Sequence, residues 1–374
     1  MRFSFLIVFL IISTSAKPQV SNIDSIYGNI KRVREKVFDI SDKDNPKQIE
    51  IDEYSDSMVL IPNDLNLNIY DILFSGSNIG YENYERIYNE NGDILKNTWF
   101  VKKDEFYEST TYKYDKKNRV IRKIDSTNNY VSIKNHYYED FDEFTNENII
   151  SLSFDSNYFN HTIKQHKDNK VIRIKHIDEF GNITEYINNY TLNGKLKSTT
   201  VKKPETWRKN EEGGWSYGVH DSITNVFKSR INEYDEKNRI LKSFEYNYSI
   251  KNNYKAPILL HQVLYNYENN KTTVKEIYES GMISSKSYIY DNQNRIIKYF
   301  CCSDTISDSN LIREYSYKNG KIVSGKLITK DNGKIEIQKI DFKYKYDDKN
   351  NWIEIIKLVD GKERFKRIRE IEYY

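Results

Sequence analysis

The chain has 374 residues, with 58 basic and 55 acidic side chains and a net charge of +3. Proteins that bind nucleic acid or anionic membranes usually present a strongly basic face, so this balance excludes both partners from our expectations. The 32 tyrosines and 17 phenylalanines raise the aromatic share to 14%, which favours pleated strands over helices.

Residues 1–16 have the features of a signal peptide. Arg2 forms a short positive region, Phe5 to Ile12 an apolar run, and Ala16 ends a small-residue cleavage site. The run is about half of the roughly 20 residues that span a bilayer, and no later segment is as apolar. We therefore predict an exported chain, in the periplasm, at the cell surface or outside the cell, with no membrane insertion.

Residues 17–80 lack the turn motif that appears later in the chain. Two stretches still alternate as strands do, VREKVFDI from Val33 and IDEYSDSMVLI from Ile51. We assign residues 17–80 as an N-terminal β capping region that hides a sheet edge. A separate binding domain of this length is the alternative.

A turn motif repeats through residues 81–374. The segments YDKKNRV, YDEKNRI, YDNQNRI and YDDKNNW align without gaps, and IDEFGNI keeps the same frame. Their aspartates are spaced by 63, 57, 56 and 56 residues, which indicates a repeat architecture. The turn residues are Tyr114, Asp115, Asn118, Arg119, Asp178, Gly181, Tyr234, Asp235, Asn238, Arg239, Tyr290, Asp291, Asn294, Arg295, Tyr346, Asp347 and Asn350.

The composition of the motif suits a tight hairpin. An aspartate carboxylate can accept backbone N–H groups two residues on, and the Asn or Gly that follows tolerates positive φ. Flanking residues alternate with period 2, as Phe342, Tyr344 and Tyr346 do on one face. We therefore predict an all-β fold, an elongated antiparallel sheet of repeated hairpins that stays open rather than closing into a shell.

These turns resemble the RHS/YD-repeat family, whose pattern is Tyr-Asp, two variable residues, Gly or Asn, Arg or Asn, and an aliphatic residue. The resemblance covers about Tyr81 to Tyr374 and is specific at the four YD turns. It implies a bacterial cell-surface, secreted or toxin-associated protein. Long members wind into a hollow shell, from which this chain departs by its shortness and long period.

The repeat is interrupted at residues 207–217, which read as a hairpin with a Gly-Gly turn. Trp207, Trp215 and Tyr217 lie near its tip and could stack on a sugar or a peptide. We take them as possible ligand contacts. The alternative is a cross-strand aromatic pair that only holds the hairpin together.

No catalytic or metal-binding pattern is recognisable. The six histidines are scattered without an HxH or HExxH spacing, and no GxSxG elbow occurs. Carboxylates are abundant, as over residues 139–143, but abundance assigns no role. We predict no catalytic residue, metal or cofactor, and for Cys301 and Cys302 two thiols on opposite faces of a strand, with a vicinal disulfide as the alternative.

These features favour a non-enzymatic exported scaffold that binds an unidentified protein or carbohydrate at the cell envelope along its extended sheet. Two alternatives stay open. One is a carbohydrate-active hydrolase with paired carboxylates, and the other is an accessory or neutralising partner of a secreted toxin.

Overall fold

The structure is a computed structural model that describes residues 26–49, 83–101, 104–153, 158–178, 181–209, 215–248, 256–301, 311–331 and 334–374. The predicted signal peptide lies outside these ranges. The regular structure within them is β-strand, joined mostly by short turns.

The strands are β1 (Ile30–Asp39), β2 (Lys47–Gln48), β3 (Tyr84–Tyr88), β4 (Ile94–Phe100), β5 (Phe106–Tyr114), β6 (Val120–Thr127), β7 (Val131–Asp140), β8 (Thr145–Ser153), β9 (Tyr158–Lys167), β10 (Lys170–Ile177), β11 (Ile183–Tyr190), β12 (Leu196–Lys209), β13 (Trp215–Tyr234), β14 (Ile240–Tyr248), β15 (Pro257–Glu268), β16 (Lys271–Tyr278), β17 (Ile283–Tyr290), β18 (Ile296–Cys301), β19 (Leu311–Lys318), β20 (Lys321–Asp331), β21 (Lys334–Tyr346), β22 (Trp352–Val359) and β23 (Lys362–Tyr373).

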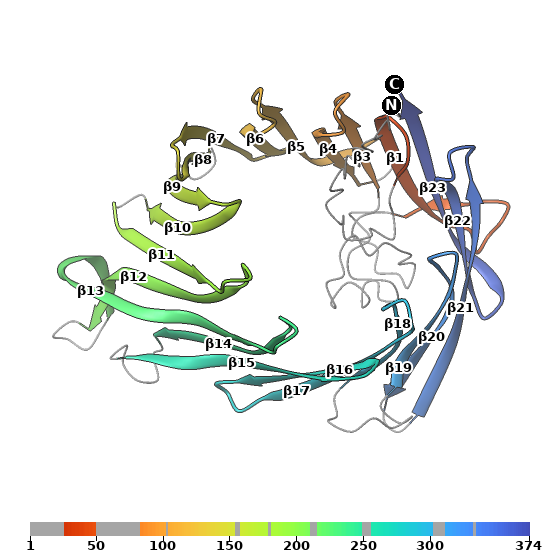
Figure 1. The fold of residues 1–374 in the computed structure, drawn as a ribbon. Coiled ribbons are helices and arrows are strands. Elements are labelled where there is room, and N and C mark those ends of the chain that lie inside the picture. Colours follow the sequence, from red (N-terminus) through yellow and green to blue (C-terminus); the bar gives the residue numbers. More distant parts are fainter. Residues whose placement is uncertain are drawn as a thin grey trace, which may run out of the picture.

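The strands form one antiparallel sheet that closes on itself. From β3 to β23 each strand pairs with its neighbours in sequence, and β1 pairs with both β23 and β3. The β1–β23 ladder has nine residue pairs, and the β1–β3 ladder has four. All of the 23 described strands except β2 therefore complete a ring of 22, a closed β-barrel (Figure 1).

The prediction of an open sheet is wrong. The closing contact joins β1 to β23, the last strand. β1 comes from the region that we assigned as a cap. Closure depends on pairing between residues more than three hundred positions apart, from Ile30↔Tyr373 to Asp39↔Phe365. Period-2 patterns identify strands but carry no signal for which distant strands pair.

The Tyr-Asp turns connect successive strands. The Asp115 carboxylate accepts the backbone N–H groups of Lys117 at 2.8 Å and Arg119 at 2.9 Å, and its other oxygen accepts Arg119 Nε at 2.8 Å. Asn118 has a φ of 60°, the left-handed conformation that asparagine tolerates. Asp235 and Asp291 accept the corresponding arginine groups in the same way.

Several of these turns also contact a tyrosine of the next hairpin. The Arg119 guanidinium lies 4.2 Å from the ring centre of Tyr138, whose hydroxyl donates to the Val120 carbonyl at 2.9 Å. In the same way, the Arg295 guanidinium lies 4.5 Å from the ring centre of Tyr317, whose hydroxyl donates to the Ile296 carbonyl at 2.8 Å. The turns therefore tie neighbouring hairpins together around the barrel.

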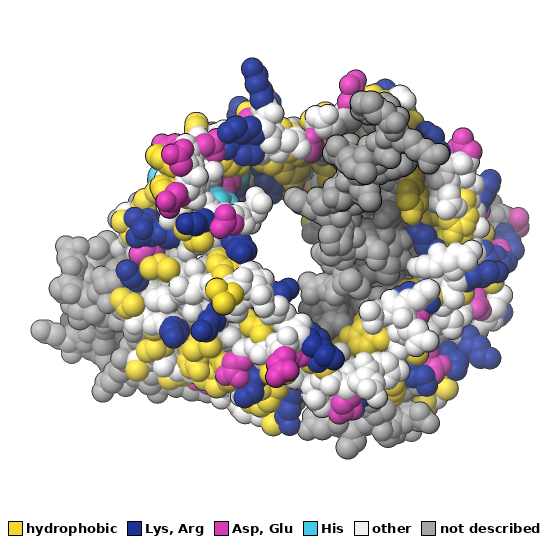
Figure 2. Space-filling model, in the orientation of Figure 1, with side chains coloured by type: hydrophobic (Ala, Val, Ile, Leu, Met, Phe, Trp, Pro, Cys, Tyr) yellow, Lys and Arg dark blue, Asp and Glu magenta, His cyan; other side chains and the backbone are white. Residues whose placement is uncertain are grey.

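One part of the interior, the apolar wall, consists of buried hydrophobic side chains on β1 and β16–β23, together with Ile49, which follows β2. Its members are Val37, Ile49, Val274, Tyr288, Ile296, Tyr299, Tyr315, Ile322, Ile340, Phe342, Trp352, Ile355 and Phe365. Residues that alternate with them point outward, and many are charged. Lys343–Glu363 at 3.0 Å and Lys366–Glu354 at 2.8 Å are examples, and Figure 2 shows Lys, Arg, Asp and Glu side chains along this outer rim.

Cys301 is disulfide-bonded, and no free cysteine occurs in the described part of the chain. The prediction of two thiols is therefore wrong for Cys301.

Candidate functional site

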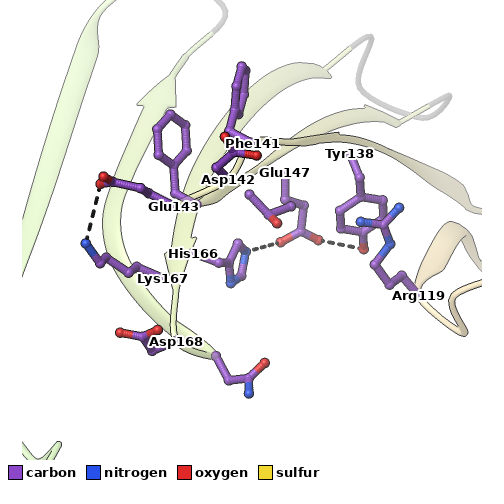
Figure 3. Close-up of a pocket in the computed structure, with 12 residues that line it drawn as sticks. Arg119, Tyr138, Phe141, Asp142, Glu143, Glu147, His166, Lys167 and Asp168 are labelled. Carbon is purple, nitrogen blue, oxygen red and sulfur yellow. Dashed lines mark hydrogen bonds and ion pairs between the residues drawn. The ribbon is translucent and has the colours of Figure 1, made fainter.

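The opposite part of the interior, the polar wall, is formed by β7–β10. Its inward-facing polar side chains are His136, Tyr138, Asp140, Thr145, Glu147, Thr162, Lys164, His166 and His176, and Ile149 and Ile174 share their face. A pocket of about 540 Å³ opens on this wall where the β7–β8 and β9–β10 turns meet (Figure 3). Its lining is Arg119, Tyr138, Phe141, Asp142, Glu143, Phe144, Thr145, Glu147, His166, Lys167, Asp168 and Asn169.

Glu147 on β8 is the centre of the polar wall. Its Oε1 lies 2.7 Å from His136 Nδ1 and accepts the Tyr138 hydroxyl at 3.3 Å. Its Oε2 lies 3.0 Å from His166 Nε2 and 3.7 Å from Lys164 Nζ. Strand register explains the convergence, because Tyr138 and Lys164 are the Cα partners of Glu147 on β7 and β9. Three hydrogen-bond partners and the Lys164 charge engage both carboxylate oxygens, so Glu147 orients its neighbours rather than offering itself to a ligand.

The charges of the wall follow from these contacts. Burial alone would raise the pKa of Glu147, but the His136 hydrogen bond and the Lys164 charge lower it to about 2. Burial and the nearby Glu147 carboxylate raise the pKa of Tyr138. At neutral pH Glu147 is therefore ionised and Tyr138 keeps its proton as a donor.

The edge of the pocket beside the β5–β6 turn is fixed by ion pairs. Arg119 Nη1 lies 2.7 Å from Asp140 Oδ1, and Lys117 Nζ lies 2.6 Å from Asp140 Oδ2. The Lys117 and Thr145 hydrogen bonds lower the pKa of Asp140 to about 2. Arg119 is thus shared between its own turn and the polar wall.

The mouth of the pocket combines an aromatic surface with polar groups of both signs. The rings of Phe141 and Phe144 are 4.7 Å apart, and Phe141 is 52% exposed. Glu143 pairs with Lys167 at 3.7 Å, and Asp168 holds the β9–β10 turn with a φ of 51°. A few polar groups around an apolar surface are the usual composition of a small-molecule site.

The predicted ligand contacts lie elsewhere. In the β12–β13 hairpin, Trp207 is the Cα partner of Tyr217, and Trp215 that of Lys209. The side chains of these residues lie outside what the structure describes. Of the turn residues named from the sequence, only Arg119 lines the pocket.

Sequence reasoning missed the central group of the pocket wall. In the sequence His136 and His166 are scattered, and no pattern singles out Glu147. One signal was present: His136 and Tyr138 are two residues apart and so share a strand face. What the sequence lacked was the register that places Glu147 opposite Tyr138.

The described residues contain no group of three or more His, Cys, Asp or Glu side chains arranged to hold a metal ion. They also contain no helix with the length and apolarity needed to cross a membrane.

Comparison with known proteins returns structures but no family. No family model matches the chain, and neither does any curated protein. A porin-like protein from Bacteroides uniformis is 9% identical, with a TM-score of 0.26 over 93% of this chain and 99% of that one. A porin-like protein from Bacteroides vulgatus is 10% identical, with a TM-score of 0.22 over 75% and 98%. The closed fold rests on the strand pairings and not on these likenesses.

These findings correct three predictions. The resemblance to the RHS/YD-repeat family is wrong as an assignment, because no family model matches the chain. The scaffold that binds a macromolecule along an open sheet is wrong because the sheet is closed. The prediction that the chain does not insert into a membrane is also wrong, because a closed antiparallel barrel is an architecture able to span a bilayer.

Proposed function

We propose that this chain works through the interior of its barrel, as a non-catalytic protein that takes up a small polar solute at the pocket beside Glu147. One observation carries the proposal: side chains from three turns and three strands converge on a single inward-facing pocket of about 540 Å³. That size lies within the range of ligand pockets, roughly 300–1,000 Å³.

The site is preorganised for binding. Glu147 and Asp140 each hold several partners, so His166, Tyr138 and Arg119 keep fixed positions before a solute arrives. Fixed polar groups lose little freedom on binding, which leaves more of the contact energy for affinity. The predicted signal peptide supports an exported location for this uptake.

The proposal is tested by thermal unfolding in the presence of arginine, glycine betaine and glucose, as cationic, zwitterionic and neutral probes. We expect at least one probe to raise the Tm, because a ligand that binds only the folded state stabilises it. The double variant Phe141→Ala, Asp168→Asn should remove that shift. The matched control is Tyr137→Ala, which changes an exposed ring on the outer face of β7 and should keep it.

If none of the probes shifts the Tm, or if the shift survives in the Phe141→Ala, Asp168→Asn variant, the pocket is not the site of uptake.

Passage of a solute through a membrane is a second candidate, favoured by the closed sheet, which leaves its backbone groups paired around the ring. Lipid requires an apolar outer band, whereas the outer faces of β21–β23 carry ion pairs such as Lys366–Glu354. Planar-bilayer recording of the purified chain separates the two candidates. Stepwise conductance would support passage, and solute binding without conductance would support a container.

A further inference from the structure

The boundary between β1 and β3 has one of the shortest ladders in the described barrel. Its ladder has four residue pairs, from Arg32↔Ile87 to Glu35↔Tyr84, whereas β1 makes nine with β23. Beyond Glu35 the same edge of β1 pairs with β2 instead. Most neighbouring strands of the barrel are joined by a short turn. In contrast, β1 is not consecutive in the chain with either of its barrel neighbours, β3 and β23.

The apolar wall stops at this boundary. Val37 of β1 belongs to the same buried cluster as Phe365 of β23, so hydrophobic packing continues across the β1–β23 boundary. No residue of β3 belongs to that cluster. The ladder between β18 and β19 is also short, with three pairs, but Tyr299 and Tyr315 on either side of it both lie in the cluster.

The contacts that do cross from β1 to β3 and its neighbours are mostly polar or ionic. Arg32 Nη1 lies 2.8 Å from Glu85 Oε2, and the Val37 N–H donates to Asn83 Oδ1 at 3.2 Å. Arg34 lies over the Phe100 ring at 3.4 Å and pairs with Asp104, which is 90% exposed. Arg34 itself is buried, but Asp104 is exposed and the Arg32–Glu85 pair is partly exposed, at 37% and 23%, so solvent screens both ion pairs.

The Glu35 cluster, composed of Glu35, Tyr84, Arg367 and Arg369, shows how the boundary can separate. Glu35 is fully buried and accepts Arg367 Nε at 2.7 Å, Arg369 Nε at 2.8 Å and the Tyr84 hydroxyl. Both arginines lie on β23, so the neutral tyrosine is the member of this cluster that lies across the boundary, and the charge of Arg86 on β3 also acts on Glu35. Separation of β3 leaves the carboxylate paired with both arginines and avoids the large cost of an unpaired buried charge.

We propose that the barrel wall opens between β1 and β3, with β1 remaining on β23 and the Tyr84 hydroxyl as the last buried contact to release. The opening gives the interior an entrance through its side. It follows from the ladder lengths, the limit of the apolar cluster and the pairing of Glu35, and it does not depend on which solute the interior takes.

Hydrogen exchange of the full chain, resolved to short segments, tests the opening. We expect the amides of residues 84–87 to exchange faster than those of residues 366–371, which face β1 from the other side. Tyr84→Phe should speed exchange at residues 84–87 by about fivefold to tenfold, the effect of losing one hydrogen bond, and leave residues 366–371 unchanged.

Two further variants make the result decisive. Tyr344→Phe removes a hydroxyl that donates to the Ile322 carbonyl on the apolar wall, and it should leave residues 84–87 unchanged. Arg34→Cys with Glu85→Cys joins Cα partners across the boundary, and its disulfide should slow exchange there. Equal protection on the two sides of β1, or faster exchange at β18–β19 than at β1–β3, would overturn the proposal.

Discussion

The two walls of the barrel interior use the same strand pattern for opposite purposes. On the apolar wall, alternate positions hold Phe342, Trp352 and Ile355, which are nearly inaccessible to solvent. On the polar wall the same positions hold Tyr138, Glu147 and His166, which face an open pocket. Period-2 alternation therefore fixes which side chains point inward, whereas their chemistry decides whether a wall is packed or available to a ligand.

The largest expected difference between the walls lies in packing. Ile355→Ala on the apolar wall should lower the free energy of unfolding by about 4 kcal/mol, because the dense cluster around it leaves a cavity. Ile149→Ala on the polar wall makes the same chemical change and should cost about 2 kcal/mol, since Ile149 is 7% exposed and belongs to neither buried cluster. Urea unfolding measures both, and equal losses would contradict the contrast.

The polar wall should depend instead on its central carboxylate. Glu147→Gln removes the charge that His136, His166 and Lys164 share, and should lower stability by about 2 kcal/mol. Glu143→Gln is the matched control, because Glu143 is 80% exposed and its ion pair with Lys167 is long, at 3.7 Å. A loss as large in the control would show that Glu147 has no special role.

Acid should weaken the same wall. The pKa of Glu147 is about 2 in the folded chain, against an ordinary value of 4.5. A lowered folded pKa gives stability that is present above pH 4.5 and is lost as the pH falls toward 2. Glu147→Gln should therefore lose less stability than the parent chain between these pH values, as measured by thermal unfolding. Parallel pH curves would contradict the assignment.

The smallest effect concerns the turns, which the two walls share. Asp291→Ala removes acceptors for the backbone N–H groups of Gln293 and Arg295 and should cost about 1 kcal/mol. Asp341→Ala, at an exposed position within a strand, should change stability by less than about 0.5 kcal/mol. Chemical unfolding of the two variants measures both effects. If Asp291→Ala leaves the free energy of unfolding unchanged, the turn does not stabilise the barrel.

The all-β class and the strand pattern could be predicted from the sequence, whereas the closure of the barrel and the pocket could not. Strand alternation at Phe342, Tyr344 and Tyr346 and the all-β class follow from side-chain period and turn chemistry, both of which act over a few residues. Closure does not, because it depends on the pairing of Ile30–Asp39 with the last strand. The same limit hid the pocket, whose central contact between His166 and Glu147 joins residues on two different strands.

Pairing between the first and last strands is the central claim, and a disulfide tests it directly. Lys36 and Ile368 are Cα partners on the outer face of β1 and β23, at a separation that antiparallel strands make suitable for a disulfide. We predict that Lys36→Cys with Ile368→Cys oxidises within one chain to give a folded monomer of parental stability or higher. Thiols that stay reduced, or bonds that form only between chains, would contradict the closed barrel.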